Sequence, residues 1–354
     1  LAFSNFDIEI SNRVEKLETK TNIIEKLETK IKTNIVNVSK SQGNNAVQLA
    51  LNSITDASAI NRYIINVSNG LYGIHKKEDF IGNPGYPAMI CPKDYVSIKG
   101  QNKSSTILSA DFDESVGEDT WMYQTIYNWA NEVTISNITF VAKNLRYVLH
   151  QDNPQETNGT RYYENVDFIF LGNKGYLRAL GIGTYSGSKT YVNGGKSQSQ
   201  DLSTFTVHNN INFSKPSLWS FKGHEFEVLN SEKVVEIYNS GSNQDCEIYL
   251  ENCSFNGSFI FSYEESWLYS QNVNDHFNHA NWCIKGSNNS PFYFKNTVIG
   301  STLCIETISK TKDSKVRFDV NSSAYPILIK NHINNYFGNL GNPNRKIKDD
   351  YVVQ

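Results

Sequence analysis

Apolar residues in the first forty positions recur at the spacing of an amphipathic helix, with Glu and Lys between them. The stripe consists of Val14, Leu17, Thr21, Ile24, Leu27, Ile31, Ile35 and Val38. The step from Ile24 to Leu27 is one residue shorter than a heptad repeat requires, and the hexapeptide EKLETK returns after ten residues. Such a helix is marginal alone in water. We predict a parallel, three-stranded coiled-coil neck over residues 1–40; packing of the stripe on the following domain is the alternative.

A second, shorter helical pattern follows at Val47, Leu51 and Ile54. Its length and its single apolar face predict one amphipathic helix within residues 41–56. An open end of a sheet invites aggregation, so we expect this helix to cap the body that follows it.

Residues 57–320 contain many short strand patterns, each bounded by Asn, Gly or Ser. An Asn-apolar-x-aromatic motif recurs and ends at Phe140, Phe168, Phe226, Phe255 and, with Ile in the last place, at Ile299. The separations are 28, 58, 29 and 44 residues, three of which are near one or two multiples of 29. This period predicts an all-β solenoid of parallel coils, with Asn at the turns. An antiparallel sandwich is the alternative, but hairpin turn signals are scarce. Residues 321–354 receive no assignment.

Composition narrows the function classes. The chain has 354 residues, with Lys+Arg 33 against Asp+Glu 36 and a net charge of −3. This balance argues against a nucleic-acid partner or an anionic membrane surface, and no apolar run is long enough for membrane insertion. The start, LAFSNFDIEI, has no signal-peptide pattern and no initial Met, so we expect a fragment made in a cytoplasm. The five cysteines show no CxxC spacing; we expect buried thiols, no metal and no cofactor.

Candidate catalytic residues gather in the segment HQDNPQE. Cleavage of a polysaccharide needs paired carboxylates, or a base beside a cation. His150, Asp152 and Glu156 follow a strand pattern, where a loop should open onto the surface, and Arg161 comes shortly after. His208 with Asn209 lies 58 residues beyond His150, which is two periods, so both histidines could lie on one face. Ordinary loop charges and internal histidines are the alternative.

Two further segments supply candidate substrate-binding residues. Arg178 and Tyr185 lie in the Gly-rich stretch YLRALGIGTYSG and could clamp an acidic sugar or a phosphate, or stiffen a loop. The segment 261–282 combines aromatic and acidic residues that suit sugar rings, or that close the side of a solenoid. The candidates there are Glu264, Glu265, Trp267 and Tyr269.

Several stretches resemble the pectin lyase-like superfamily, as found in bacteriophage tailspikes and tail appendages. They are AVQLALNSITDASAINRYIINVSNGLYG, PAMICPKDYVSIKGQNKSSTIL, VTISNITFVAKNLRYVLHQD, FTVHNN and YLENCSFNG, spread over residues 44–300. The resemblance implies a right-handed parallel β-helix, because that is the fold of the family.

The same resemblance implies a role on a phage tail. It implies a homotrimer that acts on the virion tail, outside the host cell, together with other phage tail proteins. Such a trimer would bind a bacterial surface glycopolymer (capsule, exopolysaccharide or teichoic acid) and depolymerise it as a hydrolase or a lyase. A non-catalytic glycan-binding adhesin is the alternative.

A third hypothesis is a carbohydrate esterase. ENVDFIFLGN is similar to the VDFIFG strand of pectinesterases, which would make Asp167 a nucleophile. However, Leu171 interrupts the motif, no LGRPW segment follows, and the repeat alone explains a polar residue at this position.

Overall fold

The structure is a computed structural model, and it describes the chain in segments. The described residues are 13–20, 31–82, 85, 87–112, 123–145, 147–151, 159–171, 179–180, 189–199, 204–206, 217–228, 234–239, 246–256, 258–263, 267–271, 274–275, 281–286, 292–295, 298–299, 302–307, 316–318, 323–324 and 327–331. Within these residues no helix is long and apolar enough to cross a membrane.

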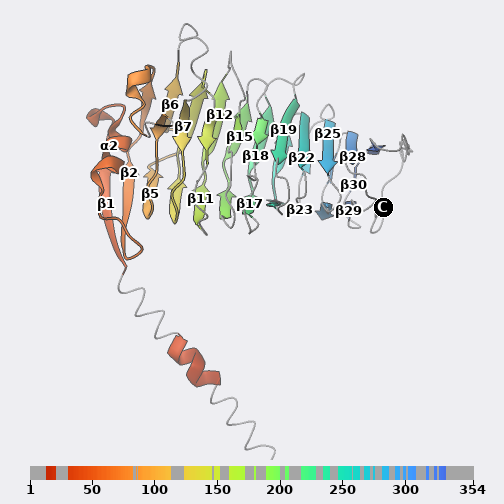
Figure 1. Ribbon diagram of the computed structural model, residues 1–354, viewed down its shortest axis with the longest axis horizontal. Helices are drawn as coiled ribbons and strands as arrows, with labels where there is room; N and C mark the ends of the chain where they lie inside the picture. Colours follow the sequence, from red (N-terminus) through yellow and green to blue (C-terminus); the bar gives the residue numbers. More distant parts are fainter. Residues whose placement is uncertain are drawn as a thin grey trace, which may run out of the picture.

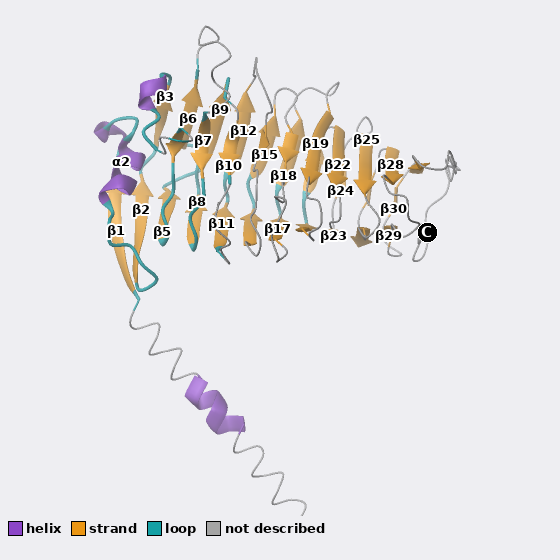
Figure 2. Ribbon diagram, in the orientation of Figure 1, coloured by secondary structure: helices purple, strands orange, loops and turns teal. Residues whose placement is uncertain are grey.

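Three parallel sheets run the length of the body, and from β2 onward the chain visits them in the order A, B, C (Figures 1 and 2). The first strand, β1, adds one further strand to sheet A. Sheet A has eleven strands: β1 (Lys32–Val38), β2 (Asn61–Val67), β5 (Val96–Gly100), β8 (Val133–Ser136), β11 (Thr160–Glu164), β14 (Lys189–Asn193), β17 (Ser217–Lys222), β20 (Cys246–Glu251), β23 (Trp267–Gln271), β26 (Phe292–Lys295) and β29 (Val316–Phe318).

Sheets B and C have ten strands each. Sheet B contains β3 (Gly70–Ile74), β6 (Thr106–Asp111), β9 (Thr139–Lys143), β12 (Asp167–Leu171), β15 (Lys196–Ser199), β18 (Glu225–Val228), β21 (Ser254–Asn256), β24 (Asn274–Asp275), β27 (Val298–Ile299) and β30 (Ser323–Ala324). Sheet C contains β4 (Ala88–Ile90), β7 (Gln124–Tyr127), β10 (Tyr147–His150), β13 (Ala179–Leu180), β16 (Thr204–Thr206), β19 (Val234–Asn239), β22 (Ser258–Tyr263), β25 (Asn281–Gly286), β28 (Thr302–Thr307) and β31 (Ile327–Asn331). Each strand pairs with the strand one coil away, which confirms the predicted solenoid of parallel coils.

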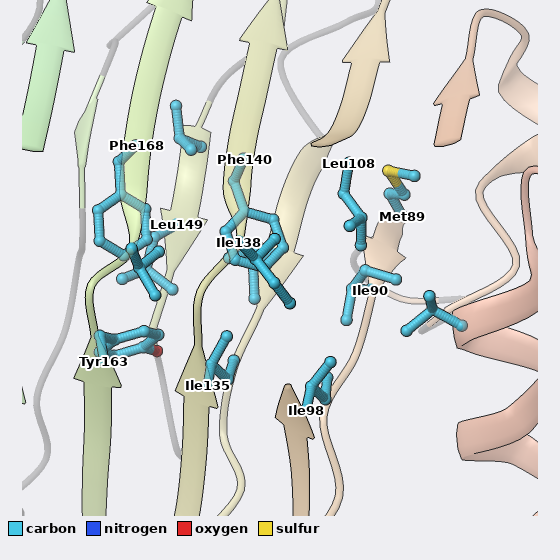
Figure 3. Packing of buried hydrophobic residues seen from close by; sticks show 14 of the residues in the cluster. Met89, Ile90, Ile98, Leu108, Ile135, Ile138, Phe140, Leu149, Tyr163 and Phe168 are labelled. Atoms are coloured by element: carbon cyan, nitrogen blue, oxygen red, sulfur yellow. The ribbon is translucent and has the colours of Figure 1, made fainter. Parts of the chain in front are cut away.

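Apolar side chains from all three sheets fill the interior in columns (Figure 3). The predicted aromatic column is confirmed, because Phe140 pairs with Phe168 and Phe226 pairs with Phe255 in sheet B. The long gap between Phe168 and Phe226 holds one further coil, which places Ser197 in the column. Cys91 and Cys253 are buried as free thiols, as expected.

From the fourth coil to Asn252, the corner between sheets A and B has two residues, and the first of them is left-handed. In one of these corners the second residue, Gly195 (φ 71°), is left-handed as well. Asn137 (φ 55°), Asn165 (φ 54°), Gly194 (φ 65°), Gly223 (φ 60°) and Asn252 (φ 54°) occupy the first position. Asn and Gly are the residues that adopt this conformation at least cost. Asn165 Nδ2 also donates to Asn137 Oδ1 at 2.8 Å, so the expected bonding between neighbouring turns is present where two Asn residues meet.

The predicted neck is only partly helical. Residues 13–20 form a helix with all side chains exposed, and residues 21–30 lie outside the described part of the chain. The expectation of a helix to residue 40 is wrong, because Lys32–Val38 is strand β1 and pairs with β2 over its full length. Ile35, Val36 and Val38 are β-branched, which favours a strand once a neighbouring strand is available.

The ends of the solenoid also differ from the expected boundaries. Helix α2 (Ala46–Ser53) confirms the short amphipathic helix, with Val47 and Leu51 buried, and it lies at the N-terminal end of the stack (Figure 1). The short helices η1 (Lys40–Gln42) and η2 (Lys77–Asp79) complete the helical elements of the described residues. Strands occur from Lys32 to Asn331, so the solenoid extends beyond the predicted limits of 57 and 320 at both ends.

Candidate functional site

Sheet A presents an outer face on which tyrosine side chains are half-exposed. In β11 the side chains of Arg161 and Tyr163 are buried, and in β14 those of Thr190 and Val192 are buried. Successive residues of a strand point to opposite faces. Tyr162 and Tyr191, which alternate with these buried residues, therefore face outward.

The outward tyrosines form one column across successive coils, which we call the tyrosine column. Tyr162 pairs with Tyr191, and their rings stack with centroids 5.2 Å apart and planes 13° apart. The register continues the column through Ser220, Tyr249, Tyr269 and Tyr293. Stacked pairs contribute about 0.5–1.5 kcal/mol beyond burial, so the described pair also stabilises the coil stack.

A row of polar and charged residues runs beside the tyrosine column, at the ends of the same strands. In register order it consists of Ser136, Glu164, Asn193, Lys222, Glu251, Gln271 and Lys295. Lys222 Nζ lies 3.2 Å from Glu251 Oε1. The outer face therefore offers apolar ring surface next to hydrogen-bonding groups of both signs.

The phenol of Tyr162 is held in its protonated form. Partial burial raises its pKa, and Tyr191, Glu132 and Glu164 add to this effect because a negative charge on any of these groups opposes ionisation of Tyr162. The hydroxyl therefore remains a hydrogen-bond donor over the whole physiological pH range.

Two described carboxylates, Glu132 and Glu164, flank Tyr162 on this face. Val133 pairs with Arg161, so Glu132 is level with Thr160, four residues before Glu164 along the strand direction. Their main chains are therefore about 13 Å apart along the strands. Among the described residues, no group of His, Cys, Asp and Glu could hold a metal ion.

His150 is buried, which corrects the expectation of a surface position. Only 4% of its surface is exposed, and its Nδ1 atom lies 2.9 Å from Oε1 of Gln124 on the preceding coil. The rings of Tyr127 and Tyr147 lie 4.8 and 5.0 Å from its ring. All four residues of strand β10 are buried, so this strand has no exposed face on which His150 could lie.

Arg161 is also interior, and its expected exposure to substrate is wrong. Its guanidinium is 1% exposed and donates from Nη2 to the carbonyl oxygen of Trp129 at 3.2 Å. Burial lowers the pKa of Arg161. The residue next to it in sequence, Tyr162, takes the outward position.

The remaining predicted site residues fall into two groups. Trp267 and Tyr269 are in β23, in the register of the outer face: Tyr269 pairs with Tyr249 in the tyrosine column, and Trp267 pairs with Glu247. The others lie outside the described residues; they are Asp152, Glu156, Arg178, Tyr185, His208, Asn209, Glu264 and Glu265.

Sequence reasoning overlooked most of the tyrosine column. The signal was present as a repeated four-residue pattern of Tyr or Ser, an apolar or small residue, a polar residue, and Asn or Gly. It reads YYEN from Tyr162, YVNG from Tyr191, SFKG from Ser220, YLEN from Tyr249, YSQN from Tyr269 and YFKN from Tyr293.

No family model matches this chain, and no curated protein matches it. Solved structures similar to it include pectin methylesterase from carrot, with 10% identity, a TM-score of 0.37, and 84% of this chain and 82% of that chain covered. Pectin methylesterase PemA from Erwinia chrysanthemi has 10% identity and a TM-score of 0.38, covering 84% and 89%. The A-module of the mannuronan C-5 epimerase AlgE4 from Azotobacter vinelandii has 12% identity and a TM-score of 0.37, covering 81% and 90%. At these scores the fold assignment rests on the strand pairing itself.

Proposed function

We propose that this protein is a receptor-binding component of a bacteriophage tail that binds a bacterial surface glycopolymer along the outer face of sheet A. The observation that carries the proposal is the tyrosine column, beginning with the stacked, half-exposed pair Tyr162 and Tyr191. Partly exposed aromatic rings that lie side by side on a protein surface are a common feature of binding sites.

The chemistry of this face suits a sugar polymer. The C–H faces of pyranose rings lose contact with water when they lie on tyrosine rings, and this burial is favourable. The hydroxyl groups at the ring edges then meet the polar row of Glu164, Asn193 and Lys222. Neighbouring coils are about 4.8 Å apart, which is close to the length of one sugar unit in an extended chain. A glycan that runs along the stack would therefore meet one aromatic position per coil, apart from the coil of Ser220.

Cleavage of the bound polymer is the extension of this proposal that the sequence favours. Its expected acid and base, Asp152 and Glu156, lie outside the described residues. The described residues of the outer face carry the binding part of the proposal. A non-catalytic adhesin and a depolymerase therefore differ by a single measurable property, the length of the polymer after incubation.

Assembly into a homotrimer is part of the same proposal. The helix at residues 13–20 exposes Val14 by 47% and Leu17 by 63%, and an eight-residue helix with exposed apolar side chains is not stable alone. Ile35 on β1 is 63% exposed and pairs in register with Ile64 on β2. Contact between copies of the chain would bury these residues, and attachment to other tail proteins would place the trimer on the virion.

The proposal is tested with surface polymers purified from candidate host bacteria. Binding of the wild-type protein is compared with that of Tyr191→Ser, a change that the fold accepts because Ser220 occupies the same column. Ile169→Ser removes apolar surface from the outer face of sheet B and serves as the control. We expect Tyr191→Ser to weaken binding roughly fivefold to tenfold and Ile169→Ser to leave it unchanged. Equal binding by all three proteins would refute the proposed face. Size-exclusion chromatography of the polymer after incubation then separates a depolymerase from an adhesin.

A further inference from the structure

A polar groove of about 810 Å³ lies where the first three coils turn from sheet A toward sheet B. It is lined by equivalent positions on successive strands. Asn37, Asn66 and Lys99 pair in register across β1, β2 and β5. Ser68, Gln101 and Gln42 add hydroxyl and amide groups to the same lining.

The groove exists because the corner changes its geometry at the fourth coil. In the first coils the corner N–H groups donate backward, from Ser68 to Val38 O and from Gln101 to Val67 O. At Asn137 the backbone becomes left-handed, and its N–H donates forward to Glu164 O. The tight corner begins at Asn137, so the wider corner of the earlier coils is left open.

Gly100 allows the two kinds of corner to meet. A Cβ atom on Gly100 would lie 2.1 Å from the carbonyl oxygen of Asn137, so only glycine lets the fourth coil close over this point. At the opposite end, Gln42 Oε1 accepts a hydrogen bond from the N–H of Ser39 at 2.6 Å, which holds the η1 turn beside the groove. Both ends of the groove are therefore fixed by local structure.

The charge of the lining selects the class of ligand. The polar side chains of the lining are amides, hydroxyls and one ammonium group, that of Lys99, and none is a carboxylate. Val38 and Val67 add apolar surface between them. Lys99 is exposed, and among the described residues it forms no ion pair. Lys222 in the same register row pairs with Glu251, and Lys103 pairs with Asp167. A lone cation among neutral hydrogen-bonding groups suits an anionic group on a hydroxyl-rich ligand.

We infer that this groove binds an acidic segment of glycan, with the negative group at Lys99 and the sugar hydroxyls at Asn66, Asn37 and Gln101. The inference rests on the proposed function, because the ligand would belong to the same glycopolymer. It adds a second site and a requirement for negative charge, which the tyrosine column does not impose. Carboxylate from a uronic acid and phosphate from a polyol phosphate are the two sources of that charge.

The test uses three short probes and three variants. Calorimetric titration is performed with an oligogalacturonate, with an oligomeric glycerol phosphate, and with a neutral dextran oligosaccharide. Lys99→Gln removes the charge. Lys143→Gln is the matched control, a lysine of sheet B outside both proposed sites that already has an acidic partner, Asp111. Tyr191→Ser reports on the tyrosine column.

We expect at least one charged probe to bind the wild-type protein and the neutral probe to bind more weakly. Lys99→Gln should weaken the charged probe roughly tenfold, the equivalent of losing one charge-assisted hydrogen bond. Lys143→Gln should bind that probe as the wild type does. The preferred charged probe identifies the source of the anion.

Two outcomes would overturn the inference. Either Lys99→Gln binds the charged probe as well as the wild type does, or no charged probe binds at millimolar concentration. In both cases the proposed function is judged separately, by the binding of host polymer to the wild type and to Tyr191→Ser. If Tyr191→Ser binds host polymer as well as the wild type does, the proposed function is refuted. The result with the short probes is not affected by that outcome.

Discussion

The hydroxyl of Ser197 lies 2.7 Å from Nε2 of His224, and Nδ1 of the same ring lies 2.8 Å from the carbonyl oxygen of Gly194. A carbonyl can only accept, so Nδ1 carries the proton and Nε2 accepts from Ser197. Ser197 is the small residue in the aromatic column of sheet B, and the His224 ring lies 4.9 Å from that of Phe226. The imidazole thus fills space that an aromatic side chain occupies on other coils.

His224 should make the folded state sensitive to acid. Burial lowers the pKa of His224 to about 4 from its ordinary 6.5. Between these values the unfolded chain binds the proton and the folded chain does not, so stability is complete above pH 6.5 and is lost as the pH falls. The loss should be about 1.4 kcal/mol per pH unit within this window. Urea unfolding of wild type and His224→Gln at pH 7, 6 and 5 measures it. Parallel loss of stability in both proteins would contradict the prediction.

Asn165 should tolerate glycine better than alanine. Its φ of 54° is left-handed, and an alanine there costs roughly 1–2 kcal/mol. Asn165→Gly should be close to neutral, because Gly194 holds the same corner on the next coil. Thermal unfolding distinguishes the two variants. Asn193→Ala, at an exposed strand position beside the corner, is the control and should change stability by less than about 0.5 kcal/mol. Equal effects of Ala and Gly at position 165 would show that the corner does not constrain the backbone.

Asp167 should behave as a structural residue. Its Oδ1 atom accepts hydrogen bonds from Lys103 Nζ and from the Lys196 N–H, both at 2.9 Å, and the residue is 8% exposed. Asp167→Asn should lower the free energy of unfolding by about 1–3 kcal/mol and leave glycan binding intact. A double-mutant cycle with Lys103→Gln measures the coupling of the pair. If instead Asp167→Asn abolished release of ester groups from a glycan at unchanged stability, the esterase hypothesis would gain and this prediction would fail.

Val14 and Leu17 should control the association of chains. Replacing both by Ser removes the exposed apolar surface of the helix at residues 13–20 without removing the helix from the chain. We expect the mass measured by sedimentation to fall from that of a trimer to that of a monomer at the same concentration. Glu15→Ser, an exposed change in the same helix, should keep the trimer. A trimer that survives the double substitution would assign assembly to another surface.

The coil stack was predictable because the same side-chain type returns at the same place in each coil. Phe140, Phe168 and Phe226 gave the period even though Ser197 interrupts it. The neck was assigned too long because the spacing of Ile31, Ile35 and Val38 fits a helix, whereas the main-chain groups of β2 offer the same residues a complete parallel partner. The presence of such a partner strand cannot be predicted from the spacing of residues within one segment.

The site was harder to predict than the fold. His150 and Arg161 have polar side chains, which suggested exposed positions. Both residues are buried, and the neighbouring coil supplies their hydrogen bonds. Tyr162 and Tyr191 are apolar enough to be taken for core, and only the register of β11 against β14 shows that they share the outer face. Residues that meet across coils are far apart in sequence, so their contact becomes known only from the register in which the strands pair.

The tight two-residue corner that joins sheets A and B from the fourth coil has a consequence for how such a chain can change over generations. Asn137, Asn165, Gly194 and Gly223 hold this corner closed, because each N–H is bonded to the next coil. Along this part of the stack, insertions and deletions are therefore accommodated at the other two corners, or as whole coils that keep every column aligned. Variation in loop length should accumulate around sheet C, while the outer face of sheet A would diversify by substitution alone, one position per coil.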